Sequence, residues 1–263
     1  MRIAAGHHTI FLLNGFRFLL GGILLLPLAK FKGAFTRSSV IFIILAGFAL
    51  FAAMAFQQAG LATTTAGNAG FITSLYVVIV PIVLWIFWRE RPSPLMGIAI
   101  PLALVGGFLL STNGSFKVRS GDILMFVGSF FWAMHVIVVA KSQGRISHLH
   151  FAIGQFVFCG VLSLLTGELV EHPSQADMIF VLPAILYTGI FSVALGFTLQ
   201  IISQKHTPAN DAALILSLEA VFAAFFGWLF IHETLSPIQL AGCASILLAV
   251  GLVQVKNGKM RTL

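Results

Sequence analysis

Residues 57–94, QQAGLATTTAGNAGFITSLYVVIVPIVLWIFWRERPSP, lie without a gap over residues 200–237, QIISQKHTPANDAALILSLEAVFAAFFGWLFIHETLSP. The two stretches are 143 residues apart, which is the distance from Glu90 to Glu233. They share a Gln, a Trp, a Glu and a Ser-Pro pair at matching positions, and such residues match by chance less readily than apolar ones do. Self-similarity at a fixed spacing indicates an internal repeat.

The apolar runs around this repeat predict a membrane protein. The chain of 263 residues is 59% hydrophobic and only 9% charged, whereas soluble domains carry about 25% charged residues. Its apolar runs are each long enough to cross a bilayer core as a helix, the structure that satisfies the backbone in lipid. We therefore predict an all-α polytopic membrane protein with nine spans, at residues 9–29, 40–62, 67–88, 94–112, 122–140, 149–169, 178–204, 209–231 and 236–255.

The charges at the ends of these spans predict an orientation. Eleven basic residues fall in one set of alternate loops and three in the other. The larger set is Lys30, Lys32, Arg37, Arg89, Arg91, Lys141, Arg145, Lys205, Lys256, Lys259 and Arg261, and the smaller is Arg2, Lys117 and Arg119. The positive-inside rule places the larger set in the cytoplasm. We therefore expect a multi-pass protein of the inner (plasma) membrane with a cytoplasmic C-terminus.

This orientation makes the repeat an inverted one. Glu90 falls in a cytoplasmic loop, whereas its counterpart Glu233 falls in an external loop. The second half also has one apolar segment more, GDILMFVGSFFWAMHVIVVAK at residues 121–141. We interpret the chain as a five-plus-five repeat of helical bundles with its first helix missing, divided into halves at residues 1–113 (four spans) and 121–256 (five spans). Inverted repeats are typical of many secondary transporters.

Three stretches carry a resemblance to the drug/metabolite transporter superfamily, of the EamA-like family. They are residues 121–141, residues 207–253 (TPANDAALILSLEAVFAAFFGWLFIHETLSPIQLAGCASILLAVGLV) and residues 63–94 (TTTAGNAGFITSLYVVIVPIVLWIFWRERPSP). The resemblance implies ten helices in two inverted halves around a central cavity. It also implies transport of small metabolites, amino acids or drugs without ATP hydrolysis. By this interpretation the chain would depart from the family in lacking the first helix.

We accordingly expect a secondary transporter that works by alternating access, an exporter coupled to a proton or counter-substrate gradient. Its partners would be a small-molecule substrate and the lipid bilayer, and the sequence does not decide whether the protein forms a homodimer. A non-transporting scaffold, a channel-like protein and an inactive truncated fragment are the alternatives. Nucleic-acid binding is not expected despite the net charge of +7, because the basic residues lie at segment ends.

The motifs of several enzyme classes are missing. The HET of residues 232–234 begins like a zinc-protease motif but lacks the second His of HExxH. No GxSxG, Walker or GxGxxG motif occurs. We therefore expect neither an enzyme nor a cofactor or metal site.

Two ionisable residues stand out among those inside the predicted spans, Glu219 and Arg17. A charge at membrane depth costs about 2.5–3.5 kcal/mol on insertion scales, so such a residue is expected to face a cavity or a partner. Glu219 could bind a cationic group or a coupling proton, or it could be a structural acid satisfied by Arg17. Because both residues lie at similar predicted depths, we expect their side chains nearly to meet.

Helical spacing adds further candidates for substrate binding. Asn68 and Tyr76 fall on one helix face, and the repeat places Tyr76 opposite Glu219. Trp132 and His135 form a second polar stripe, which could hold an amphipathic organic molecule or could simply bond across helices. Gln57 and Gln200 are repeat-related amides inside spans, where bridging neighbouring helices is an alternative to substrate contact.

Overall fold

The computed structural model describes residues 9–29 and 36–261. Arg2, Lys30 and Lys32, three of the basic residues used for the orientation, lie outside this part. The described helices are α2 (Ile10–Leu25), η1 (Leu26–Leu28), α3 (Arg37–Leu61), α4 (Ala66–Ser74), α5 (Tyr76–Trp88), α6 (Met96–Thr112), α7 (Gly121–Ser142), α8 (His148–Val170), α9 (Gln175–Tyr187), η2 (Thr188–Phe197), α10 (Thr198–Ser203), α11 (Ala209–Leu216), α12 (Leu218–Ile231) and α13 (Pro237–Arg261).

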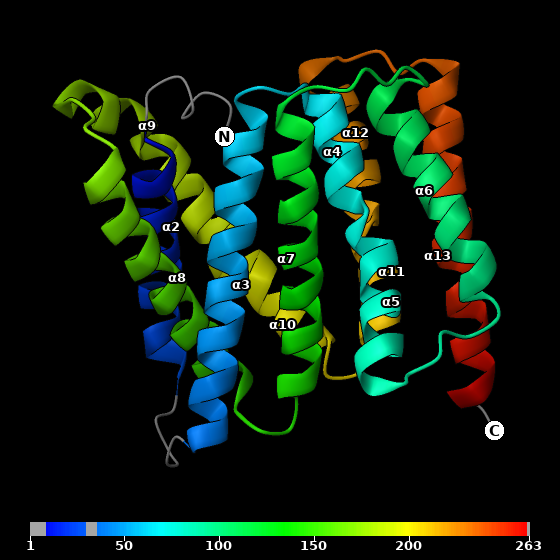
Figure 1. The fold of residues 1–263 in the computed structure, drawn as a ribbon, viewed down its shortest axis with the longest axis horizontal. Coiled ribbons are helices and arrows are strands. Elements are labelled where there is room, and N and C mark those ends of the chain that lie inside the picture. The colour runs from blue at the N-terminus through cyan, green and yellow to red at the C-terminus, as the bar shows by residue number, and fades with distance from the viewer. Residues whose placement is uncertain (1–8, 30–35, 262–263) are drawn as a thin grey trace.

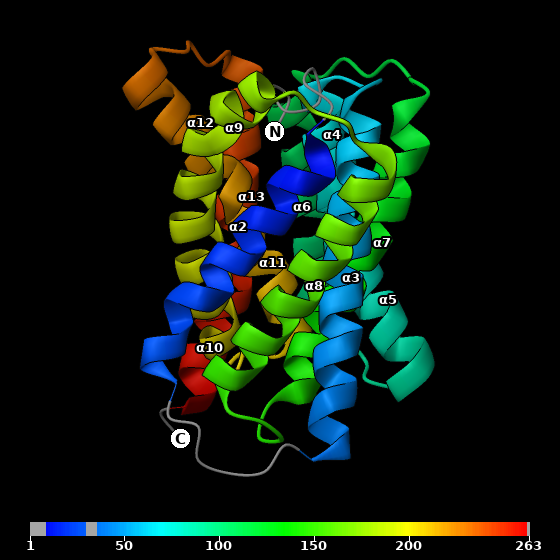
Figure 2. The same cartoon turned by 90° about the vertical axis from the view of Figure 1, so that its left-hand side faces the viewer.

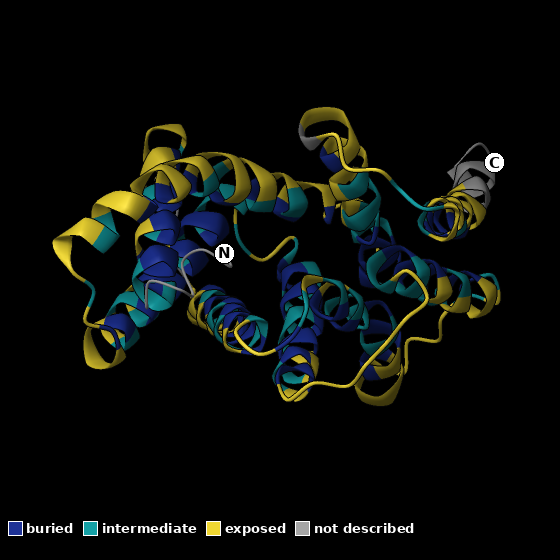
Figure 3. Cartoon of the chain, turned by 90° about the horizontal axis from the view of Figure 1, so that it is seen from above, coloured by how far each residue is buried: buried dark blue, intermediate teal, exposed yellow. Residues whose placement is uncertain are grey.

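These elements confirm a polytopic helical protein. Eight helical stretches of the described chain are long and apolar enough to cross a membrane. The ninth, α6, has 17 residues and is about 25 Å long at 1.5 Å per residue. The outward surface of the bundle carries large apolar side chains such as Phe87, Leu169 and Phe230, each more than 70% exposed. Figure 3 shows buried positions between the helices and exposed positions around them, as expected where lipid is the solvent.

One span in each half is interrupted at nearly the same place, one residue apart under the 143-residue spacing. A one-residue turn separates α4 from α5 at Leu75, and another separates α11 from α12 at Ser217. In the first half Ser74 donates its hydroxyl to the Phe71 carbonyl, and in the second half Ser217 donates its hydroxyl to Leu214, the position equivalent to Phe71, at 2.6 Å in both cases. The turns therefore keep their carbonyls satisfied inside the protein, as a break in a membrane helix requires.

The two interrupted spans run in opposite directions. Figure 1 shows α4 above α5 but α12 above α11. Both spans also end on a left-handed residue, Arg89 with φ 56° and His232 with φ 58°, which are 143 residues apart. The repeat is therefore visible in the backbone, with its two copies inverted.

The helices form two groups that share α7. In the first group α2 packs on α8 and η2, and α3 packs on α7 and α8; Figure 2 shows α2 between α8 and the α9–α10 span. In the second group α6 packs along α13, α4 packs on α6 and α7, and α5 packs on α7 and α11. Helix α7 therefore connects the groups.

Polar side chains tie the helix ends together. At the basic end of the molecule, where Arg89 and Arg145 lie, Lys141 pairs with Glu90. At the acidic end, where Asp122 and Glu171 lie, the Glu171 carboxylate accepts hydrogen bonds of 2.8 and 2.9 Å from the backbone amides of Phe11 and Leu12. Glu171 thus satisfies amides that the first turn of α2 leaves free.

Repeat-related helices are covered to different degrees. Val80 and Val83 of α5 are 0% and 8% exposed, because α7 and α11 pack over them. The equivalent positions of α12 are Ala223, which is exposed, and Phe226, which is 48% exposed. Helix α7 thus covers one face of α5, and within the described residues no helix covers the equivalent face of α12.

We expect Gly242→Ala to destabilise the protein. A Cβ at Gly242 would lie 2.6 Å from the Leu110 nitrogen and 2.7 Å from the Gly106 oxygen. Because both are backbone atoms, α6 and α13 would have to separate, at a cost of about 1–3 kcal/mol. Thermal unfolding in detergent measures the effect, with Gly251→Ala of the same helix as control, since a Cβ there meets nothing within 4 Å. Equal melting temperatures of the two variants would contradict this close contact.

Candidate functional site

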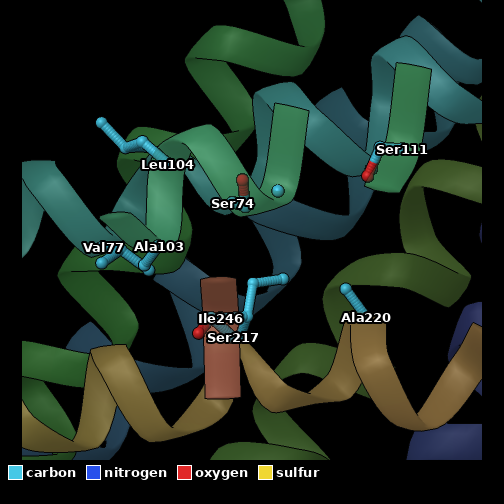
Figure 4. Close-up of a pocket in the computed structure, with 10 residues that line it drawn as sticks. Ser74, Val77, Ala103, Leu104, Ser111, Ser217, Ala220 and Ile246 are labelled. Carbon is cyan, nitrogen blue, oxygen red and sulfur yellow. The ribbon is translucent and has the colours of Figure 1, made fainter. Parts of the chain in front are cut away.

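A small pocket lies where the two interrupted spans meet α6 and α13. Its lining contains three pairs of residues that the 143-residue spacing relates: Ser74 and Ser217, Val77 and Ala220, and Ala103 and Ile246. Figure 4 shows these residues around the pocket on separate helices. The pocket therefore lies on the approximate twofold axis between the halves. About 20 Å³ of it is open to water, room for roughly one molecule, so in this state it is a packing junction.

Tyr76 and Glu219 flank this junction, each one residue before a lining residue. Tyr76 is half-buried and packs in two apolar clusters, beside Leu214 in one and Ala213 in the other. Its phenol lies within electrostatic reach of the Glu219 carboxylate. Glu219 is exposed at the first turn of α12, and no hydrogen bond of its carboxylate occurs within residues 9–29 and 36–261. The two symmetry-related candidates thus lie at the same junction.

A second set of candidates surrounds Phe197, the last residue of η2. The Trp132 ring stacks on the Phe197 ring at 6.0 Å between centroids. His135 meets Phe197 edge-on at 6.1 Å, and its Nε2 lies 3.0 Å from the Gln155 Oε1 atom. His135 and Gln155 are fully buried. Helices α7 and α8 thus hold an imidazole–amide pair against an aromatic wall.

Arg17 and Glu219 do not meet, contrary to the expectation from their similar depths. Arg17 is 2% exposed in the first helix group, where its Nη2 atom lies 3.0 Å from the Met54 sulfur and its Cζ atom lies 5.0 Å from the centre of the Phe18 ring. Depth along the membrane fixes one coordinate only, and these two residues are separated laterally, on α2 and α12.

Asn68 lies at the acidic end, where its amide is already occupied. Its Nδ2 atom donates to the Lys117 carbonyl at 2.9 Å and to the Asp122 carboxylate at 3.1 Å. Asp122 also accepts from the Thr64 hydroxyl at 2.5 Å and the Arg119 amide at 2.8 Å. This network ties α4 to the start of α7, and a substrate contact of Asn68 stays a prediction.

The two glutamines differ in what their side chains do. Gln57 on α3 donates from Nε2 to the Thr73 hydroxyl on α4 at 3.4 Å, so it bridges neighbouring helices. Gln200, its repeat partner on α10, is half-buried. A role of either amide in substrate binding also stays a prediction.

Sequence reasoning missed Gln155 and Phe197 as parts of the site. Neither lies in a repeated motif, and a glutamine or phenylalanine in a long apolar run carries no signal of its own. The serines of the two kinks could have been recognised, because Ser74 and Ser217 match in the repeat. The π-helical turns of η2 left no mark in the sequence, since their apolar residues also suit an α-helix.

The architecture is therefore that of a helical membrane protein built from two inverted halves. Residues 1–112 and 119–255 match the EamA-like transporter family. The chain is 32% identical over 259 residues to an uncharacterized transporter of Archaeoglobus fulgidus, covering 97% of this chain and 80% of that protein. It is 27% identical over 176 residues to the threonine/homoserine exporter RhtA of Escherichia coli K12, covering 64% of this chain and 57% of that protein.

A solved crystal structure has the same fold. It superposes with a TM-score of 0.78 at 19% sequence identity, covering 92% of this chain and 88% of the other. The chain belongs to the EamA-like transporter family, within the drug/metabolite transporter superfamily. The family and its relatives support a membrane transporter, and the relatives are transporters rather than enzymes.

We expect Asp122→Asn to lower the melting temperature of the protein. The Asp122 carboxylate accepts hydrogen bonds from Thr64, Asn68 and the Arg119 amide. An asparagine there would replace one accepting oxygen by an NH₂ group that faces another donor. The lost hydrogen bond would cost about 1–3 kcal/mol. Asp177→Asn, in the exposed capping box of α9, is the control and should shift the melting temperature less. A larger effect at Asp177 would show that the Asp122 network is dispensable.

Proposed function

We propose that the chain is a secondary transporter that moves small metabolites, amino acids or drug-like organic molecules across the inner (plasma) membrane by alternating access. The similarity to RhtA, named as a threonine/homoserine exporter, supports export of a small amino-acid-like solute. The basic end is the cytoplasmic side in this proposal, and a proton or counter-substrate gradient drives transport.

One observation carries the proposal: the packing of the interrupted spans is not symmetric. At the basic end α5 packs on α11. In the repeat, α5 corresponds to α12 and α11 corresponds to α4, so the equivalent pair at the acidic end is α12 and α4. Within the described residues these two helices do not pack on each other to a comparable extent. The state is therefore closed at the basic end and less closely packed at the acidic end.

An inverted repeat gives such a molecule a second state at little cost. If the halves exchange conformations, α4 packs on α12 and α5 leaves α11, which opens the basic end instead. The turns at Leu75 and Ser217 are the hinges in this mechanism, because short 3₁₀-like turns inside helices often mark hinges. The site between the turns is thereby exposed to one side at a time.

Glu219 is the residue proposed to bind a cationic group or the coupling proton. It lies two residues after the hinge of the second half, and its carboxylate has no hydrogen bond in the described structure. Its repeat partner Tyr76 is uncharged, so the two halves differ in charge at this position. An unpaired carboxylate beside a hinge is suited to bind different partners in the two states.

Tethering α5 to α11 should stop transport. We suggest cysteines at Val80 and Ala213, which share an apolar cluster, in a chain with Cys159→Ala and Cys243→Ala. Bridging them with a short bis-maleimide would hold the basic end closed and abolish counterflow in proteoliposomes. The control bridges cysteines at Ala99 and Val250, on α6 and α13, which share another apolar cluster outside the pocket lining and stay together in this mechanism. Full counterflow after the first bridge would refute alternating access between these helices.

Substitution of Glu219 tests its proposed role. Glu219→Gln keeps the shape of the side chain but removes its charge, so we expect counterflow to fall by about tenfold or more and to lose its pH dependence. Glu233→Gln, at the acidic end, should transport like the wild type. Wild-type rates and pH dependence in Glu219→Gln would eliminate the proposed role.

A further inference from the structure

We propose that Arg17 and the polar atoms around Phe197 form a binding site for the carboxylate group of a small organic molecule. The inference names a substrate class and so rests on the proposed transport function. It would make the solute an amino acid or another organic monoacid, held between α2, α7 and α8. It gives Arg17 a role separate from Glu219, which the structure places elsewhere.

The first argument is that Arg17 is a buried cation without a carboxylate partner. Its side chain is 2% exposed, and the groups it meets are two sulfurs: that of Met54, a weak acceptor, and the thiol of Cys159. All eight acidic residues of the chain lie in the described part, and none of them pairs with Arg17. A buried guanidinium normally has a carboxylate partner, because its desolvation is otherwise uncompensated. A ligand can supply that missing partner.

The second argument is that further buried polar atoms in the same helix group lack partners. In the described structure the unpartnered atoms include Nε of Arg17, Nε1 of Trp132 and Nε2 of Gln155, all of which are donors. Oγ1 of Thr198, which can also donate, is buried without a partner as well. Buried donors are nearly always satisfied. An excess of donors in one region therefore indicates a ligand rich in acceptors.

The third argument is that these atoms belong to one continuous cluster. Phe197 stands at its centre, with Trp132 on one side and the Phe18 ring 6.0 Å away on the other. The Arg17 Cζ atom lies 5.0 Å from that Phe18 ring. His135 joins Gln155 to the cluster through their 3.0 Å contact. Aromatic rings thus form a wall, and the donors border it.

The chemistry of the cluster favours a carboxylate over other anions. A guanidinium presents paired N–H groups that match the two oxygens of a carboxylate. Arg17 is the one Lys or Arg side chain in the cluster, and a single positive charge balances a monoacid but not a phosphate dianion. The apolar rings would contact the organic part of the molecule.

The wall beside Arg17 has the structure of a movable element. Residues Thr188–Phe197 are π-helical and pack on α2, where a Cβ at Gly189 would lie 3.2 Å from the Arg17 carbonyl. The π-helix is less favourable than the α-helix and occurs often at functional sites. A return of η2 toward α-helical geometry would shift Phe197 and expose the guanidinium.

The test compares acids with their amides on the full chain in detergent. The probes are L-threonine, L-phenylalanine and benzoate, each against threoninamide, phenylalaninamide or benzamide, with binding followed by melting temperature and by tryptophan fluorescence. At least one acid should bind, and its amide about tenfold more weakly or not at all. Equal binding of acid and amide, or no binding of any acid, would overturn the inference.

Substitution at Arg17 separates binding from stability. Arg17→Met removes the buried charge, so the ligand-free variant should melt no lower than the wild type, yet bind the acid at least about tenfold more weakly. Arg17→Lys should recover part of the affinity, since it keeps the charge but not the paired N–H groups. The control is Arg145→Met, an exposed cation beside Phe42, which should bind like the wild type. Undiminished acid binding by a folded Arg17→Met protein would overturn the inference.

Counterflow in proteoliposomes distinguishes this inference from the proposed function. If the wild type exchanges the amides and the acids at equal rates, the transporter stands and the carboxylate site fails. If the acids bind through Arg17 but no solute is exchanged, the carboxylate site is supported and the proposed transport function is refuted.

Discussion

The arrangement depends on a constraint at the middle of two membrane spans. A helix that breaks inside lipid frees a carbonyl group, and that carbonyl must find a donor within the protein. In the two halves the hydroxyls of Ser74 and Ser217 donate to the repeat-related carbonyls of Phe71 and Leu214, and the Leu214 carbonyl also accepts the Ser217 backbone amide. The breaks can therefore lie at membrane depth, and small side chains let four helices converge on them. The position of the twofold junction follows from these two turns.

The polar groups of the interior are separated by the two helix groups that share α7. The second group holds Tyr76 and Glu219 beside the junction. The first group holds Arg17 among aromatic rings. A carboxylate and a guanidinium that never meet inside the chain can each remain available to a solute.

The sequence predicted the spans well because their cause is local. Apolar length and turn residues determine where a segment crosses lipid, and the structural bounds differ from the predicted ones by a few residues, for example 175–203 against 178–204. The repeat also related Tyr76 to Glu219, the two candidates that flank the junction. The wrong expectation, that Arg17 meets Glu219, came from depth alone, because depth does not determine lateral position. The cluster at Phe197 depends on packing between α7, α8 and η2, which no local pattern encodes.

The cap that Glu171 places on α2 has a consequence for biosynthesis. Its carboxylate bonds to amides about 160 positions earlier in the chain. During translation α2 enters the membrane long before the end of α8 leaves the ribosome. Until Glu171 is in place, the first amides of α2 can form hydrogen bonds only with water and lipid headgroups. The early half therefore cannot reach its final state as an autonomous unit. Maturation of the whole bundle becomes a post-insertional event, in which the second half completes the first.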